Sequence, residues 1–320
     1  MKRSLHPPKA TRQVSFHELL IAARKTWTVD ALHEALARIE PNLLKKQLSI
    51  YAPNDIQKIL ASLGIRDEEV IPTPIVLESQ PTLVGYYRLL TGVSQKGFYS
   101  NGTGMGPFQR MENGGTVTPI TRKLLPKFCK EMSSILSDLI RSISPALSAR
   151  DLHELQLLTL GSNFYGSINN TIGIAATKGI LEAISDIYSR NITNHSPRSL
   201  TIATSFGRTY SVVLSSDPDV AIQETTEGRT RNLLSIEIKG GSDASNVYNR
   251  GGEAEKSHQG AKQRGFLLCW TIIRTSGIDF DKLKRGSPTT DSWFDTAQIL
   301  AHKGDDWENF RSKLISLVEL

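Results

Sequence analysis

The segment LLSIEIKGGSDASNVYNRGGEAEKSHQGAKQRGF, residues 233–266, joins a strand-like run to a helix-like run. Successive side chains of a strand point to opposite faces, so Ile236 and Ile238 share one face and Glu237 and Lys239 share the other. A carboxylate and an ammonium on a half-buried strand are costly unless they are paired or hydrated. The segment therefore predicts either an ordinary ion pair at a sheet margin or a polar functional site.

The residues around this segment predict an α/β core. Short runs rich in β-branched residues, separated by Gly, Asp and Pro, are typical of strands, and apolar spacings of three and four are typical of helices. The pattern predicts helices at 169–190 and about 251–264, and strands at 199–206, 207–216, 219–223, 232–241 and 266–274. This order of helix, antiparallel strands, helix and strand indicates a mixed central sheet flanked by helices.

The first half of the chain reads as largely helical. Apolar residues recur at helical spacing within residues 14–65, 81–93 and 121–143. Between them lies GFYSNGTGMGPFQRMENGGT, residues 97–116, which we expect to be a long glycine-rich loop. It lacks the GxxxxGK[ST] pattern of a nucleotide site. It is either a loop that closes over a ligand or DNA or a mobile surface loop.

Composition excludes several classes of protein. The chain has 320 residues, a formal net charge of +6 and a pI near 9.2, which weakly indicates a polyanionic partner such as nucleic acid. Its two cysteines stand far apart in apolar contexts, as expected of buried thiols, and no histidine has metal-ligand spacing, so zinc is not expected. No apolar run is long enough to span a bilayer, and the basic N-terminus is no secretory signal, so we expect a cytoplasmic protein.

A second carboxylate gives the Glu237–Lys239 pair a chemical meaning. Asp219 follows Pro218 and opens a short strand. If that strand lies beside residues 233–239, Asp219 and Glu237 converge and form a hard oxygen site that suits Mg²⁺, with the Ile238 carbonyl as a third ligand. Lys239 then lies within reach of a water at the metal. Magnesium and an in-line water are what phosphodiester hydrolysis needs.

These residues resemble a known nuclease core. Pro218-Asp219 followed by Glu237-Ile238-Lys239, in an αβββαβ order, is similar to the PD-(D/E)XK fold, and GGSDASNVYNRGGEAEKSHQGAK resembles type II restriction endonucleases of the XcyI-like group. The resemblance implies that Asp219, Glu237 and Lys239 are catalytic and that Mg²⁺ is the cofactor. Asp217 replaces Asp219 if the strand begins earlier.

The same resemblance implies the reaction and the partners. The expected enzyme belongs to a restriction–modification system, cuts double-stranded DNA at a short palindrome to leave 5′-phosphates, acts as a homodimer and has a cognate DNA methyltransferase as genetic partner. A GC-rich site such as CCCGGG is suggested. Residues 1–165 would form a helical region that clasps DNA or dimerises, and residues 166–320 the catalytic core with a helical C-terminal extension.

Several further residues are candidates with two interpretations each. Glu182, Glu255 and His258 are either accessory groups at the metal site or, as we favour for the last two, a solvated carboxylate and a core histidine. Asn246, Asn249 and Arg250 lie in the expected loop between strand and helix, where they either contact DNA or shape a turn. Arg110, in the glycine-rich segment, is a further candidate for DNA contact.

Other functions remain open at this point. A repair or junction-resolving nuclease of the same fold is the nearest alternative, and a non-catalytic DNA-binding protein is the next. A metabolic enzyme is the least expected, because the sequence has no phosphate loop, Cys–His pair or zinc motif.

Overall fold

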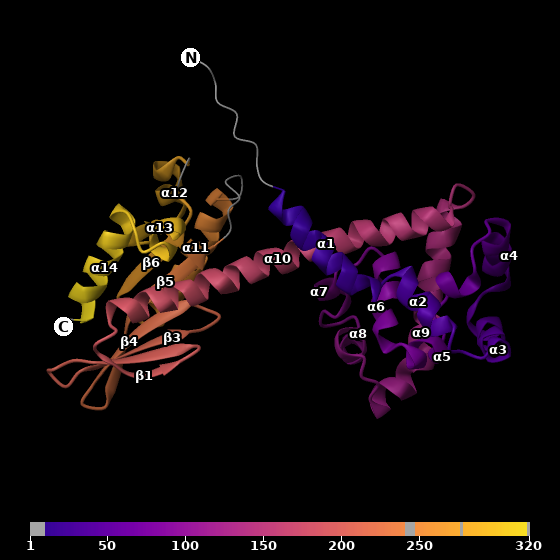
Figure 1. Cartoon of the computed structure of the whole chain (residues 1–320), viewed down its shortest axis with the longest axis horizontal. Coiled ribbons are helices and arrows are strands. Elements are labelled where there is room, and N and C mark those ends of the chain that lie inside the picture. The colour runs from indigo at the N-terminus through magenta and orange to yellow at the C-terminus, as the bar shows by residue number, and fades with distance from the viewer. Residues whose placement is uncertain (1–9, 241–246, 276–277, 319–320) are drawn as a thin grey trace, which may run out of the picture. The chain divides into compact units, whose positions relative to one another are not determined.

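The computed structural model describes residues 10–240, 247–275 and 278–318, and the chain forms two compact units, Met1–Ile168 and Asn169–Leu320 (Figure 1). One helix, α10 (Ala149–Ile187), contributes residues to both units. No helix within the described residues is long and apolar enough to cross a membrane.

The first unit is helical, as the sequence predicts. Most of its buried apolar residues form one large cluster that includes Leu32, Ile56, Leu77, Tyr87 and Leu136, and a smaller second cluster lies around Phe164. Its elements are α1 (Thr11–Arg24), α2 (Val29–Leu36), α3 (Pro41–Tyr51), α4 (Asn54–Ser62), η1 (Asp67–Glu69), α5 (Pro74–Ser79), η2 (Pro81–Leu83), α6 (Val84–Leu90), α7 (Gln95–Phe98), η3 (Gly106–Phe108), α8 (Gln109–Gly114), α9 (Pro119–Ile143) and the beginning of α10.

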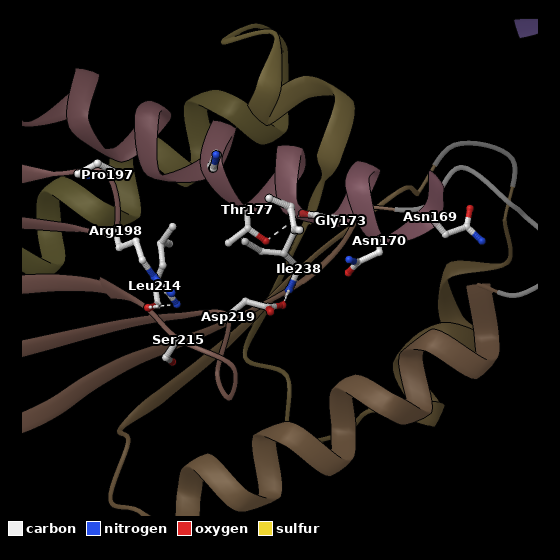
Figure 2. A pocket seen from close by; sticks show the side chains of 12 residues that line it. Asn169, Asn170, Gly173, Thr177, Pro197, Arg198, Leu214, Ser215, Asp219 and Ile238 are labelled. Carbon is white, nitrogen blue, oxygen red and sulfur yellow. Dashed lines mark hydrogen bonds between the residues drawn. The ribbon is translucent and has the colours of Figure 1, made fainter. Parts of the chain in front are cut away.

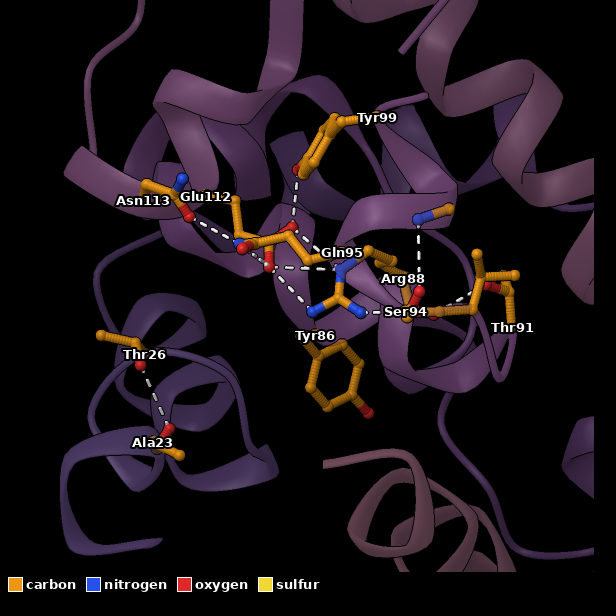
Figure 3. Close-up of polar contacts among 12 residues, drawn as sticks. Ala23, Thr26, Tyr86, Arg88, Thr91, Ser94, Gln95, Tyr99, Glu112 and Asn113 are labelled. Atoms are coloured by element: carbon orange, nitrogen blue, oxygen red, sulfur yellow. Dashed lines mark hydrogen bonds and ion pairs between the residues drawn. The ribbon is translucent and has the colours of Figure 1, made fainter. Parts of the chain in front are cut away.

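The glycine-rich segment is more ordered than a long irregular loop, and that expectation is wrong for most of it. It holds the end of α7, then η3 and α8, and a buried ion pair fastens it to the helical core (Figure 3). Glu112 Oε1 lies 2.8 Å from Arg88 Nη2, and both side chains are almost fully buried. Tyr99 Oη and Gln95 Nε2 donate to the same carboxylate at 2.6 and 3.0 Å. A buried carboxylate that accepts hydrogen bonds from three residues fixes the segment in place.

The second unit is built on a seven-stranded mixed sheet, which confirms the predicted mixed α/β class. The strands lie in chain order; β1 to β5 are antiparallel neighbours, and β5, β6 and β7 are parallel. Their bounds are β1 (Ile192–Ser196), β2 (Ser199–Ala203), β3 (Thr209–Leu214), β4 (Val220–Thr226), β5 (Arg229–Lys239), β6 (Leu268–Ile273) and β7 (Ser292–Asp295).

Helices cover both faces of this sheet. On one face, Ile236 packs in a cluster with Ile184 of α10 and Leu314 of α14 (Asp305–Val318). On the other face, α11 (Val247–Gln263) packs against β5 and β6 through a row of small and apolar residues. Its described residues also form two short helices, α12 (Phe280–Gly286) and α13 (Thr296–Leu300).

Helix α11 begins four residues before the predicted start. Val247 is 1% exposed and packs against Ile273 and Leu283, so burial of its side chain recruits the preceding turn into the helix. Asn249 and Arg250 therefore lie in the first turn of α11 and not in a loop, which corrects that part of the prediction.

Candidate active site

The pairing of β4 with β5 brings Asp219 to the end of β5. Val220 lies opposite Ile236 in this antiparallel pair, so Asp219, one residue earlier, lies across from Glu237. The Asp219 side chain caps the strand end, because its Oδ2 accepts a hydrogen bond from the Ile238 backbone N–H at 2.8 Å (Figure 2). The structure thus places Asp219, Glu237 and Lys239, the three catalytic candidates of the sequence analysis, at the same strand end.

Glu237 and Lys239 form an ion pair on the face of β5 that carries α11. Lys239 Nζ lies 2.8 Å from Glu237 Oε1 and 3.6 Å from Glu253 Oε2. Glu237 is only 8% exposed, and its other oxygen, Oε2, accepts from the Ser257 hydroxyl at 2.8 Å. The buried carboxylate is therefore paired and hydrogen-bonded, as a buried charge must be.

The ionised form of Asp219 is electrostatically unfavourable. Burial, followed by the negative charge of Glu237, raises its pKa to about 6. Burial alone would lower the pKa of Lys239, but the charge and hydrogen bond of Glu237 outweigh burial and raise it above its ordinary value. Lys239 is therefore an ammonium near neutral pH, which suits it to donate hydrogen bonds and not to act as a base.

The oxygen atoms at this strand end are of the kind that binds a hard divalent cation. The N–H and C=O of one residue in an extended strand point toward the same neighbour, so the Ile238 carbonyl faces the side on which Asp219 lies. A cation there would relieve the repulsion that raises the pKa of Asp219. Two carboxylates and a carbonyl are oxygen ligands of the kind that Mg²⁺ takes. Within the described ranges, no group of three or more His, Cys, Asp or Glu residues is placed to hold a metal.

Asp217, the alternative to Asp219, has other partners. Its Oδ2 lies 3.0 Å from Arg264 Nη1, and its Oδ1 accepts from Ser257 at 2.7 Å. These two hydrogen bonds, that from Arg264 first, hold the pKa of Asp217 below its ordinary value. Asp217 is exposed and paired with Arg264, whereas Asp219 is half-buried and bonded to the Ile238 N–H, so the two carboxylates are not interchangeable in this structure.

Ser257, which our reading of the sequence missed, joins these groups. Its Oγ lies within hydrogen-bond distance of both Asp217 Oδ1 and Glu237 Oε2. A hydroxyl has one hydrogen, so Ser257 serves one of the two carboxylates at a time. The only available signal was its place on α11, next to His258 and three residues after Ala254 on the face that packs on the sheet.

The accessory candidates lie in three different settings. His258 is fully buried, and its Nε2 lies 2.8 Å from Thr271 Oγ1; burial lowers its pKa. Glu255 accepts hydrogen bonds from Thr289 N at 2.9 Å and Thr289 Oγ1 at 2.6 Å, so it ties α11 to the chain before β7. Glu182 is exposed on α10, and no hydrogen bond or ion pair links it to another described residue.

The DNA-contact candidates belong to both units. Asn249 is exposed and Arg250 partly exposed in the first turn of α11. Arg110 is exposed on α8 of the first unit. Asn246 lies outside the described residues.

Comparison with known proteins gives the chain its family. A family model described as XcyI restriction endonuclease matches residues 17–320. The chain is 35% identical over 323 residues to the type II restriction enzyme XcyI of Xanthomonas campestris pv. cyanopsidis, covering 100% of this chain and 96% of that protein. It is 33% identical over 317 residues to the type II restriction enzyme Cfr9I of Citrobacter freundii, covering 98% and 96%. The chain belongs to the XcyI restriction endonuclease family.

Proposed function

We propose that the chain hydrolyses phosphodiester bonds of double-stranded DNA at a specific site, with Asp219, Glu237 and the Ile238 carbonyl holding Mg²⁺ in a core of the PD-(D/E)XK type. The family assignment makes the chain a type II restriction endonuclease. The observation that carries the residue assignment is the hydrogen bond from Ile238 N–H to Asp219, beside the buried Glu237–Lys239 pair.

Each residue has a distinct part in this proposal. Asp219 and Glu237 present oxygens to the cation, and the Ser257 hydroxyl orients the Glu237 carboxylate when it donates to Glu237 and not to Asp217. Lys239 stays protonated beside Glu237, so it donates hydrogen bonds to the attacking water or to a phosphate oxygen. When bound, Mg²⁺ supplies positive charge to the phosphate and lowers the pKa of the attacking water.

The proposal extends to the substrate and the assembly. A palindromic site is matched by a twofold protein, so we propose a homodimer that leaves 5′-phosphates at each cut. A DNA methyltransferase would protect the host copy of the site, and CCCGGG is the first sequence to test. The helical first unit and the residues at Asn249, Arg250 and Arg110 would supply DNA contacts outside the chemical centre.

The decisive experiment is digestion of unmethylated, amplified DNA with Mg²⁺, with EDTA, and with the Lys239→Ala variant. Discrete fragments that require both Mg²⁺ and the wild-type chain are expected, and end sequencing would give the site, the cut position and the terminal phosphate. Lys313→Ala is the matched control, because Lys313 is exposed on α14 and should cleave normally. Normal cleavage by Lys239→Ala would overturn the assigned chemistry, and absence of cleavage by the wild type would overturn the activity.

A further inference from the structure

A cavity of about 550 Å³ opens beside Asp219 on the α10 side of the sheet (Figure 2). Asp219 and Ile238 form one part of its lining, so it is continuous with the candidate metal site. The side chains along α10 form one wall, and the turn between β1 and β2 and the end of β3 form the other. The residues used below are Asn169, Asn170, Thr177, Lys178, Arg198 and Ser215.

The cavity has a cation on each wall that pairs with no carboxylate of the described residues. Lys178 on α10 and Arg198 on the β1–β2 turn are both exposed, and neither has an ion pair with a described residue. The guanidinium of Arg198 donates one long hydrogen bond, 3.4 Å from its Nη2 to the Leu214 carbonyl. Lys239 and Arg264 nearby, by contrast, are each paired with a carboxylate.

The donors that remain available select the kind of ligand. The hydroxyl of Thr177 donates to the Gly173 carbonyl at 3.1 Å, and the hydroxyl of Ser215 donates to the Pro218 carbonyl, so neither hydrogen is free for a ligand. The guanidinium of Arg198, the ammonium of Lys178 and the amides of Asn169 and Asn170 remain. This set is cationic and rich in N–H donors, which is the chemistry that binds phosphate oxygens.

We infer that this cavity seats a backbone phosphate of the DNA strand next to the phosphate that is cleaved, held by Arg198 and Lys178. The inference rests on the proposed function, because it takes Asp219 as part of the chemical centre. A phosphate held beside Asp219 fixes the register of the strand and offsets the repulsion between the DNA and the carboxylates of the site. Arg198 and Lys178 are positioning residues in this arrangement.

The test uses the full chain and a duplex carrying the cleaved site, with Ca²⁺ in place of Mg²⁺ to prevent cleavage during binding. Arg198→Ala and Lys178→Ala are each expected to weaken binding about tenfold, and to reduce the slope of log affinity against log salt by about 0.9. Arg229→Ala is the matched control, because Arg229 is exposed at the opposite end of β5 and should leave the slope unchanged. Thermal unfolding checks that each variant is folded.

Single methylphosphonate substitutions, which remove the charge of one phosphate, identify the contact. A methylphosphonate at one position flanking the cut should weaken DNA binding by the wild type. The same substitution should not weaken binding by Arg198→Ala any further. An unchanged salt slope in both variants, or additive losses at every position, would overturn the inference while cleavage by the wild type still stands. The inference would also be overturned if inorganic phosphate stabilised the wild type but not Arg198→Ala, while Arg198→Ala bound DNA as tightly as the wild type. The cavity would then bind a free phosphate and not one of the DNA backbone.

Discussion

Replacing Asp219 by asparagine is expected to stabilise the metal-free protein near neutral pH. The carboxylate is half-buried beside Glu237, and its pKa is raised to about 6. Because the folded pKa exceeds the unfolded value, the chain is most stable when Asp219 is protonated and loses that stability as pH rises through about 6. An asparagine is neutral at every pH, and its side-chain oxygen can still accept the Ile238 N–H.

The size of the effect follows from the difference between the two pKa values. Raising a carboxyl pKa from its ordinary 3.8 to about 6 costs roughly 3 kcal/mol once the group is ionised, at about 1.4 kcal/mol per pKa unit. Solvent reaches part of the Asp219 side chain and screens its charge, so we expect about 1–2 kcal/mol in the unfolding free energy. The difference between variant and wild type should be near zero at pH 4 and should reach its full value above about pH 6.

The assay is urea unfolding in EDTA from pH 4 to pH 8, followed by tryptophan fluorescence. Trp270, Trp293 and Trp307 all lie in the second unit, so the signal reports mainly on the unit that holds Asp219. Asp217→Asn is the control with the opposite sign, since the lowered pKa of Asp217 means that this variant loses stability at neutral pH. A stability difference for Asp219→Asn that does not change between pH 4 and pH 7, or a destabilised variant at pH 7, would refute the reasoning.

Three further changes test the strand end. Lys239→Ala should slow single-turnover cleavage by about 10²–10³-fold, as expected for the loss of one electrostatic donor, while binding of the duplex in Ca²⁺ persists; parallel loss of binding would point to a structural role. Ser257→Ala removes the donor to Glu237 and should slow cleavage about tenfold, whereas Ser257→Thr should largely restore it; equal rates for all three proteins would exclude a positioning role. Gly240→Ala places a methyl group 2.7 Å from a side chain of α10 and should destabilise the second unit by about 1–3 kcal/mol in urea. In the control Gly252→Ala, on α11, the added methyl group has no atom within 4 Å and should stabilise the unit by about 1 kcal/mol. Equal effects of the two substitutions would contradict the close packing at Gly240.

Strong periodicity carried most of the fold prediction. The runs that became β2 to β6 contain alternating or continuous β-branched residues, and α9 has a long apolar stripe, so burial on a fixed face was visible in the sequence. Strand β1, ITNHS, lies at the sheet edge with three exposed residues, and β7, SWFD, is four residues long. Neither is long or apolar enough to produce a periodic signal in the sequence. Each is a strand because it pairs with a neighbouring strand of the sheet.

In the candidate site too, residues of one strand could be predicted from the sequence, and contacts between separate elements could not. Glu237 and Lys239 were visible because they belong to one strand, where alternation decides their face. Ser257 was not visible, because its contact with Glu237 depends on how α11 docks on the sheet. The glycine-rich segment was misjudged for a related reason: its order depends on Glu112, which reaches Arg88 across 24 residues of sequence. Contacts made by tertiary packing leave little trace in local sequence.

The charges at the end of β5 are those expected if, as we propose, the site binds a cation and a phosphate. Glu237 is neutralised by Lys239, and Asp217 by Arg264. Asp219 keeps a raised pKa because burial and the charge of Glu237 outweigh its hydrogen bond from Ile238, and Arg198, on the wall of the adjoining cavity, has no carboxylate partner among the described residues. A direct ion pair between Asp219 and Arg198 would cancel both charges. It would remove the attraction of the site for a cation and for a phosphate. Keeping Asp219 and Arg198 apart costs stability in the free protein, and in the proposed complex it would give the metal and the DNA backbone adjacent sites of opposite charge.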